Sequence, residues 1–121
     1  MLNIELIEVK VEPPTVDDVK DIINTIEMNY KAQIEIAWPC IKLAQRIASD
    51  GFKVVLSGEG SDELWASYGM SYHGIEEHGF EEYRLRLFGS QERKNFSRCN
   101  KIFMKYGVEC RLPFLNTELV E

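Results

Sequence analysis

The spacing of apolar residues in the first part of the chain predicts a strand followed by a helix. Apolar and polar residues alternate loosely over residues 3–11, which is typical of a strand, and Pro13-Pro14 ends it because proline cannot donate a backbone hydrogen bond. Apolar residues then recur at helical spacing over residues 16–29. Thr15 stands where a helix cap is needed, and acidic residues follow in the first turn.

A second helix and a second strand are predicted next. Helical spacing continues over residues 32–49, where Pro39 predicts a kink or a new helix start because it removes one helical hydrogen bond. Gly51 is placed to end this helix. Residues 52–56 form a short apolar run without alternation, which suits a strand buried on both faces in a parallel sheet.

The remainder of the chain predicts helices. Residues 75–88 and 90–106 have helical spacing, with Ser90 as the expected cap of the second helix and Gly107 as its end. Asn116 is placed to cap a last short helix. This order of elements predicts a helix-rich α/β class. Two strands cannot make a stable doubly wound sheet, so we expect the chain to be part of a larger domain.

Composition narrows the class of protein. The chain has 121 residues, 45% hydrophobic and 28% charged, which is typical of one soluble globular domain. No apolar run approaches the roughly 18–20 residues that cross a bilayer, so we expect no membrane partner. The first five residues lack the features of a signal peptide, and the three cysteines have no CxxC spacing. We therefore expect a cytoplasmic protein without a disulfide framework.

Charge is divided unevenly along the chain. The formal net charge of −6 argues against a nucleic-acid partner. Residues 1–83 hold 16 acids and 6 bases, whereas residues 84–121 hold 4 acids and 8 bases. The bases of the second part either form a solvated helical face that complements the acidic part, or a site for phosphate or an acidic partner. Seven of the eight bases lie within residues 84–105: Arg84, Arg86, Arg93, Lys94, Arg98, Lys101 and Lys105.

The loop after the second predicted strand contains the residues best suited to chemistry. A glycine-containing loop between a strand and a helix lies at the carboxyl end of a sheet, where α/β proteins bind ligands. Gly58 and Gly60 allow a ligand to approach the backbone and allow positive φ. The Ser57 hydroxyl and the free amides at a helix start suit an anion.

The same loop carries three carboxylates, Glu59, Asp62 and Glu63. Like charges about 4 Å apart repel by about 4 kcal/mol at a protein-like dielectric, so we do not expect a site for bare phosphate. The loop is explained if Mg²⁺ bridges a carboxylate to phosphate, if a carboxylate acts as a base, or if the substrate carries an ammonium group. Alternatively, the acids are part of an Asx-type turn and the first turn of a helix.

Two stretches of the sequence resemble signatures of one family. VLSGEGSDELW, at residues 55–65, resembles the second signature of the asparagine synthetase synthase domain. GVECRLPFLN, at residues 107–116, is similar to the later GVExRxPFLD signature of that family, in the same order and at a similar separation. Residues 32–47 are similar to the proline-containing helix of the family. The resemblance covers essentially the whole chain, residues 1–121.

The resemblance implies a fold and a reaction. The fold would be a fragment of a parallel-sheet domain of the adenine nucleotide alpha hydrolase-like type, the N-type ATP pyrophosphatases. In that family aspartate attacks the α-phosphate of ATP, which gives β-aspartyl-AMP and pyrophosphate, and ammonia then forms asparagine. ATP and Mg²⁺ are the implied cofactors, and ATP and aspartate the implied small-molecule ligands.

Roles are implied by position in the matching motif. Ser57, Gly58 and Gly60 match the nucleotide-contacting loop, Glu59 matches the acidic residue needed for adenylation, and Asp62 matches a carboxylate associated with Mg²⁺. Arg98 falls where the family has an arginine before an Asn/Asp-Lys/Arg pair, here Asn100-Lys101. The resemblance does not define the role of Arg98.

The sequence also departs from the family pattern. These 121 residues contain no SGGxDS pyrophosphate loop, and they include neither the glutaminase domain nor the later helices of the family. Ala66-Ser67 replaces the usual pair of glycines, and Asn116 stands where aspartate is usual. We therefore expect the chain to be inactive alone, and either to act with a second polypeptide that supplies the pyrophosphate loop or to be a residual fragment.

Two other functions fit the same motifs. The chain could be a non-catalytic nucleotide-binding or regulatory module that keeps the fold without turnover. It could also belong to an adenylating synthetase with another carboxylate substrate, such as a β-lactam-forming enzyme. Nucleotide binding without pyrophosphate release distinguishes the first possibility, and the identity of the acid that supports release distinguishes the second.

Overall fold

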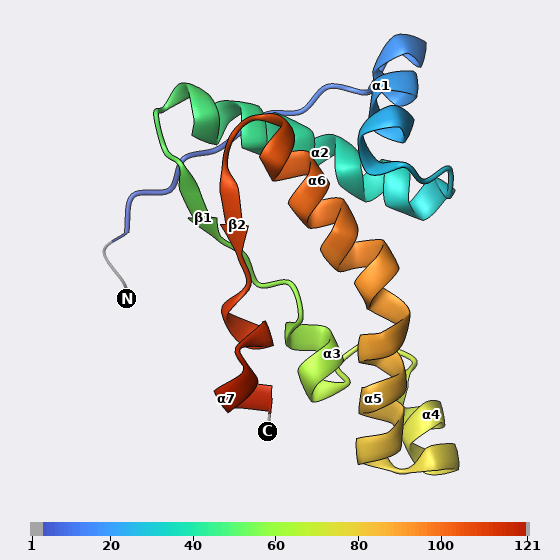
Figure 1. The fold of residues 1–121 in the computed structure, drawn as a ribbon. Helices are drawn as coiled ribbons and strands as arrows, with labels where there is room; N and C mark the ends of the chain where they lie inside the picture. The colour runs from blue at the N-terminus through green and yellow to red at the C-terminus, as the bar shows by residue number, and fades with distance from the viewer. Residues whose placement is uncertain (1–3, 121) are drawn as a thin grey trace.

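The computed structural model describes residues 4–120, without the side chain of Glu92. Helices dominate, and two short strands lie beside them (Figure 1). The helices and strands, in chain order, are α1 (Val16–Ile26), α2 (Lys31–Ser49), β1 (Val54–Leu56), α3 (Ser61–Trp65), α4 (Ser71–His78), α5 (Phe80–Gln91), the π-helix η1 (Glu92–Phe96), α6 (Ser97–Lys105), β2 (Glu109–Arg111), the 3₁₀-helix η2 (Pro113–Leu115) and α7 (Thr117–Val120).

The first predicted helix is confirmed as α1, and local side chains define its start. The Thr15 hydroxyl accepts a hydrogen bond from the Asp18 amide at 3.2 Å, and the Asp18 carboxylate accepts one from the Thr15 amide at 2.8 Å. This reciprocal capping box satisfies amides that have no partner inside the helix. The helix ends at Ile26 because Glu27 adopts a left-handed conformation, with φ 56°.

The second predicted helix is confirmed as α2, but Pro39 does not divide it. The helix runs without interruption from Lys31 to Ser49. Ala37 and Trp38 before the proline and Ile41 after it are all buried in the same core. Packing on both sides of the proline therefore outweighs the hydrogen bond that it removes. As predicted, Gly51 follows the helix with φ 86°.

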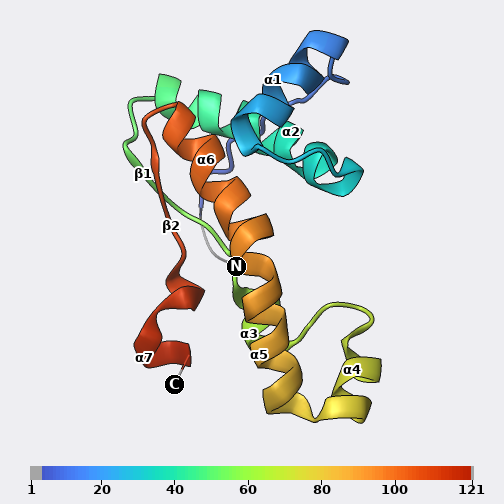
Figure 2. The ribbon, with the colours of Figure 1, turned by 45° about the vertical axis from the view of Figure 1, so that its right-hand side comes forward.

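The hydrophobic core lies where α6 crosses α1 and α2. The three helices pack against one another, and both ribbon views show α6 crossing α2 (Figures 1 and 2). Val55 and Cys110, from the two strands, pack against this core. Its buried members are Ile22, Ile26, Ala37, Trp38, Ile41, Ala44, Cys99, Ile102, Phe103 and Val108. The core thus joins residues from both ends of the chain.

The strand predicted within residues 52–56 is confirmed as β1, and it pairs in parallel with β2. Val55 lies opposite Cys110 in this two-stranded sheet. The prediction that the strand is buried on both faces is wrong within the described residues. Val54 is 41% and Leu56 69% exposed, because the helices cover only the face of the sheet that carries Val55 and Cys110.

The strand predicted over residues 3–11 is also wrong for its described part. Residues 4–11 have no regular secondary structure, and Ile4 and Leu6 are 72% and 81% exposed. A strand needs a neighbour for its backbone hydrogen bonds, and β1 and β2 pair with each other instead. A hydrogen bond from the Trp38 indole to the Glu12 carbonyl, at 2.7 Å, ties the end of this segment to α2.

The helices of the third quarter differ from their predicted bounds. The chain breaks at Gly79, with φ 79°, and then continues through α5, η1 and α6 as one long helical rod (Figure 2). Ser90 is therefore no cap: it lies inside α5 and donates to the Leu87 carbonyl at 2.9 Å. As predicted, Gly107 ends α6 with φ 68°, and Asn116 accepts a hydrogen bond from the amide of Glu118 at the start of α7.

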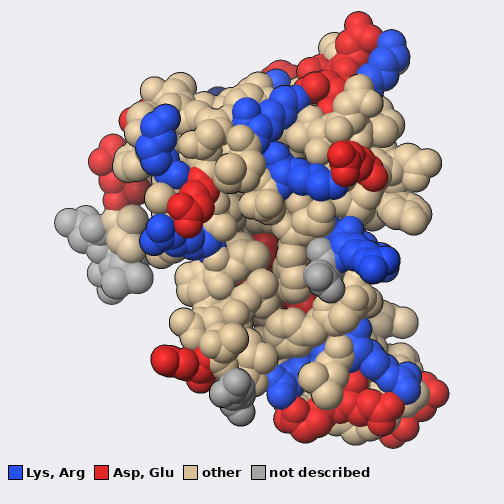
Figure 3. All heavy atoms as spheres, in the orientation of Figure 1, with Lys and Arg blue, Asp and Glu red and all other residues tan. Residues whose placement is uncertain are grey.

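Most bases of the C-terminal part pair with carboxylates. Lys101 and Lys105 on α6 reach Glu27 and Asp21 of α1. Arg84, Arg86 and Arg98 also form ion pairs with carboxylates. Basic and acidic side chains accordingly intermingle on the face drawn in Figure 3. These pairs favour the view that the bases complement the acidic part. No helix of the described chain is long and apolar enough to cross a membrane.

Candidate functional site

The carboxylate-rich loop leaves the carboxyl end of β1, as the sequence predicts for a ligand-binding loop. The Ser57 amide donates to the Arg111 carbonyl at 3.0 Å, which extends the parallel pairing by one step. The loop then turns at Gly60, where φ is 94°. A Cβ atom on Gly60 would also lie 2.5 Å from the Leu115 side chain, so this turn requires glycine. Gly58, in contrast, does not adopt a positive φ.

The residues singled out in this loop line one cavity of about 340 Å³. Figure 3 shows acidic atoms deep in the middle of the drawn face. Its lining residues are Ser57, Gly58, Glu59, Gly60, Asp62, Glu63 and Tyr68. Glu59 and Asp62 thus lie at a cavity, and that cavity lies at the carboxyl end of a parallel strand.

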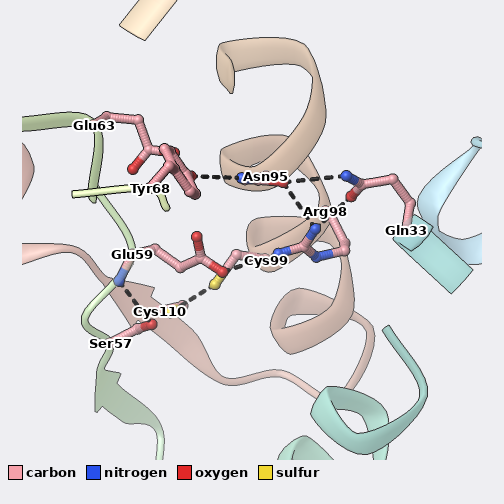
Figure 4. Close-up of polar contacts among 9 residues, drawn as sticks. All are labelled: Gln33, Ser57, Glu59, Glu63, Tyr68, Asn95, Arg98, Cys99 and Cys110. Carbon is pink, nitrogen blue, oxygen red and sulfur yellow. Dashed lines mark hydrogen bonds and ion pairs between the residues drawn. The ribbon is translucent and has the colours of Figure 1, made fainter. Parts of the chain in front are cut away.

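A buried arginine holds the central carboxylate of this cavity. Arg98 of α6 is only 2% exposed, and its Nη2 donates to Glu59 Oε1 at 2.9 Å (Figure 4). Its Nη1 donates to Asn95 Oδ1 at 2.9 Å and also to Gln33. Its buried Nε has no hydrogen-bond partner among the described residues. These contacts orient Glu59 toward α6 and give Arg98 a defined position behind the cavity.

Three residues of this network are absent from the motif-based prediction: Gln33, Tyr68 and Asn95. Asn95 accepts from Arg98 and from Gln33 Nε2, the latter at 3.2 Å, and its amide donates to the Tyr68 hydroxyl at 3.4 Å (Figure 4). The Tyr68 hydroxyl donates in turn to the buried carboxylate of Glu63. Asn95 lies in η1, and π-helices often occur at functional sites. No local sequence pattern signals a π-helix here.

The electrostatic environment of Glu59 favours its protonated form relative to water. Burial raises the pKa of its carboxyl, and the nearby carboxylates of Glu63 and Asp62 raise it further. The Arg98 guanidinium opposes this shift but does not cancel it. The pKa of Glu59 therefore lies closer to neutral pH than that of an exposed glutamate. Such shifted pKa values are common among groups at functional sites.

This raised pKa predicts a pH-dependent contribution to stability. The folded chain keeps the Glu59 proton to higher pH than the unfolded chain, so stability from this group is full below the ordinary glutamate pKa and is lost as the pH rises through the raised pKa. We expect the Glu59→Gln variant to gain stability relative to wild type over that pH window. Urea unfolding of both proteins at a series of pH values measures the difference. A difference that stays constant across the window would contradict the prediction.

Of the three carboxylates in the loop, only Asp62 is available to bind Mg²⁺ beside a nucleotide. No group of three or more ligating side chains comes together within residues 4–120 as described. Glu59 bonds to Arg98 and Glu63 bonds to Tyr68, whereas Asp62 is exposed and bonds only to the Ser67 hydroxyl among these residues. Because Mg²⁺ at nucleotide sites is held by one or two carboxylates together with phosphates and water, a single available carboxylate is sufficient.

Ala66, where the family has glycine, adopts a left-handed conformation at the end of α3, with φ 50°. That conformation costs alanine about 1–2 kcal/mol, whereas burial of its methyl group contributes about 0.8 kcal/mol. We therefore expect Ala66→Gly to change the free energy of unfolding by less than about 1 kcal/mol. Ala44→Gly, at a fully buried helical position in α2, should cost about 2 kcal/mol. Urea unfolding compares the two, and equal losses would contradict the argument.

A second and larger hollow, of about 660 Å³, lies between the end of α1 and η1. Arg93 and Lys94 contribute to its lining together with Asn24, Asn29 and Tyr30. Both bases are exposed. Among the described lining residues of this hollow, none is a buried charged group of the kind that Arg98 and Glu63 provide at the loop. We therefore assign the candidate chemistry to the smaller cavity.

The fold and the cavity define an α/β protein with an acidic, cavity-lining loop at the carboxyl end of a parallel strand. Comparison with known proteins identifies the family: the asparagine synthase family matches residues 1–98. The chain belongs to this family, as the resemblance of its motifs predicts.

Several curated relatives are asparagine synthetases that hydrolyse glutamine. The protein of Brassica oleracea is 30% identical over 105 residues, which are 87% of this chain and 18% of the relative. Asparagine synthetase 3 of Arabidopsis thaliana is 31% identical over 105 residues, which are again 87% of this chain and 18% of the relative. The protein of Asparagus officinalis is 31% identical over 106 residues, which are 88% of this chain and 18% of the relative. The chain thus spans less than a fifth of the length of these relatives.

Proposed function

We propose that the loop from Ser57 to Glu63 forms part of an ATP site at which the side-chain carboxylate of aspartate is adenylated. Attack of this carboxylate on the α-phosphate gives β-aspartyl-AMP and pyrophosphate, and ammonia then displaces AMP to give asparagine. The observation that carries the proposal is that one cavity is lined by all five residues to which the family resemblance gives a role: Ser57, Gly58, Glu59, Gly60 and Asp62. Membership of the asparagine synthase family supports it.

Ser57, Gly58 and Gly60 are the proposed nucleotide contacts. Ser57 Oγ accepts a hydrogen bond from the Glu59 amide at 3.3 Å, which holds the hydroxyl at the cavity as the proposed contact for a phosphate oxygen. A Cβ on Gly58 would meet no atom within 4 Å, so a ligand has open access to the backbone there. Gly60 provides the turn that keeps both residues at the cavity.

Glu59 is the proposed catalytic residue of adenylation. One of its carboxylate oxygens, Oε1, accepts a hydrogen bond from Arg98 Nη2. The other makes no hydrogen bond to the described residues. A free carboxylate oxygen at the cavity suits the ammonium group of an amino-acid substrate. In this role Glu59 orients the substrate so that its other carboxylate faces the α-phosphate, while Arg98 keeps Glu59 in one position.

Asp62 is the proposed residue for Mg²⁺, since it is the exposed carboxylate of the loop. The Ser67 hydroxyl donates to Asp62 Oδ1 and orients the group. A bound magnesium ion would supply charge neutralisation for the leaving pyrophosphate. Glu63 is buried and bonded to Tyr68, so we give it a supporting role in the loop rather than a contact with ligand.

We propose that a second polypeptide supplies the SGGxDS loop of the family, which these 121 residues do not include. The fold would then be that of the N-type ATP pyrophosphatases, in which further parallel strands continue the sheet. Both strands of the described sheet have one edge that no other described strand covers, and the exposed Val54 and Leu56 side chains lie on β1. Such edges are open to pairing with added strands.

Pyrophosphate release tests the proposal. We expect none from the chain alone with ATP, Mg²⁺ and aspartate, and aspartate-dependent release when a polypeptide from the same organism that carries an SGGxDS loop is added. If release depends on another carboxylic acid, that acid and not aspartate is the substrate. Binding of ATP without release in any mixture would overturn the enzymatic proposal in favour of a nucleotide-binding module.

A further inference from the structure

Two cysteine thiols meet behind the Glu59–Arg98 pair. Cys99 of α6 and Cys110 of β2 bring their sulfur atoms to 3.3 Å, although both are free cysteines (Figure 4). The two residues are 11 positions apart in the sequence, and the end of α6 and the Gly107 turn lie between them. Neither residue belongs to the proposed ATP site.

The packing of α6 against the sheet maintains this approach. Cys99 is 7% exposed and belongs to the hydrophobic core, while the half-buried Cys110 packs against that core from the middle of β2. Cys110 also lies opposite Val55 in the parallel register. Both sulfur atoms are therefore positioned by ordered elements, and the gap between them is little more than an ångström longer than a disulfide bond, which measures about 2.05 Å.

We propose that Cys99 and Cys110 are an oxidation site that forms a reversible disulfide, which links α6 to β2 at the back of the cavity. The oxidant is a small-molecule disulfide such as oxidised glutathione. This inference does not depend on ATP binding or on any activity of the chain.

The reaction is a pair of thiol–disulfide exchanges. The Cys110 thiolate, the more accessible of the two, attacks one sulfur of the glutathione disulfide and releases one glutathione thiolate. The Cys99 thiolate then attacks the Cys110 sulfur, forms the Cys99–Cys110 bond and releases the second glutathione. The two protein thiols lose two protons and two electrons, and two molecules of reduced glutathione receive them.

The buried environment slows this exchange without preventing it. Burial raises the pKa of both thiols, and the Glu59 carboxylate nearby raises them further. The reactive thiolate is therefore scarce at neutral pH, so the exchange is best followed at mildly alkaline pH. The close approach of the two sulfur atoms favours their bond over a lasting mixed disulfide with glutathione.

Cys40 provides a matched control. It is a free, half-buried cysteine on α2, and its sulfur makes no hydrogen bond to either of the other two within the described residues. Burial raises the pKa of its thiol as well. Cys40 therefore shares the chemical environment of the pair but has no sulfur atom at hydrogen-bond distance among the described residues.

Peptide mapping tests the proposal on the reduced chain of 121 residues. The chain is incubated with oxidised glutathione and a chelator, alkylated and digested with trypsin without reduction. Trypsin separates residues 99–101 from residues 106–111, so only a disulfide keeps these two peptides together. We expect the linked peptides from wild type and from Cys40→Ala, with reversal by dithiothreitol, and none from Cys99→Ala or Cys110→Ala.

Two comparisons test whether the folded structure is the reason that the disulfide forms. We expect the bond to form at least about tenfold faster in the native chain than in concentrated urea, because folding holds the sulfur atoms together. We also expect a higher midpoint of thermal unfolding for the oxidised chain than for the reduced chain. Glutathione adducts without the linked peptides, a bond to Cys40, a bond between two chains, or equal rates in urea would each overturn the proposal. The wild-type map decides the matter even if a variant does not fold.

Discussion

Replacement of Glu59 by glutamine is expected to lower aspartate-dependent pyrophosphate release by about 10²-fold or more, when the chain is assayed with the proposed second polypeptide that carries an SGGxDS loop. Glutamine keeps the size of the side chain and can still accept a hydrogen bond from Arg98 Nη2. It removes the negative charge that we propose to hold the substrate ammonium. The loss should therefore appear in turnover while the fold is kept, as measured by pyrophosphate release and circular dichroism.

Glu82→Gln is the matched control for this prediction. Glu82 is an exposed carboxylate on α5 that pairs with Arg86, so its substitution makes the same chemical change far from the cavity. We expect normal release from the control. Full activity of Glu59→Gln, or an equal loss in the two variants, would show that the assignment of Glu59 is wrong.

Replacement of Arg98 by methionine is expected to lower the free energy of unfolding by about 3–5 kcal/mol. Arg98 is nearly fully buried, and its guanidinium satisfies the carboxylate of Glu59 and the amide oxygens of Gln33 and Asn95. Without it, the half-buried Glu59 must either hold an unpaired charge or take up a proton, and the side-chain oxygens of Gln33 and Asn95 lose their donor. Urea unfolding followed by circular dichroism measures the loss.

Two further variants show whether the ion pair accounts for this loss. Arg86→Met removes an arginine that is 56% exposed and paired on the surface, and it should cost less than about 1 kcal/mol. The double variant Glu59→Gln/Arg98→Met should be less destabilised than the sum of its single changes, because each single change leaves a buried partner behind. Additive effects, or a loss for Arg98→Met as small as that for Arg86→Met, would contradict the prediction.

The local structure of the chain follows closely from neighbouring residues. Thr15 and Asp18 specify the start of α1, and Gly51 and Gly107 follow the ends of α2 and α6. These features depend on backbone conformation and on hydrogen bonds that span only a few residues, so the sequence pattern predicts them well. At Pro39 the local pattern allows a new helix to start, but packing on both sides of the proline keeps α2 as one continuous helix.

The loop from Ser57 to Glu63 was also predictable as a candidate site. Its residue types, its glycines and its place after an apolar run indicate a ligand-binding loop, and its similarity to one family adds the identity of the ligand as a hypothesis. The arrangement around it was not predictable in the same way. Arg98 is 39 residues from Glu59, and the position of its side chain depends on how α6 packs against α1 and α2.

The chain alone therefore specifies its helix ends, its acidic loop and its family, because these depend on short-range chemistry and on motifs of consecutive residues. Only the packed structure brings Glu59 to Arg98, Gln33 to Asn95, and Cys99 to Cys110. Such meetings depend on which helix and strand surfaces exclude water together, and that choice is made by the whole core at once. For the same reason residues 4–11, whose apolar and polar residues alternate as in a strand, have no strand to pair with, because β1 and β2 pair with each other.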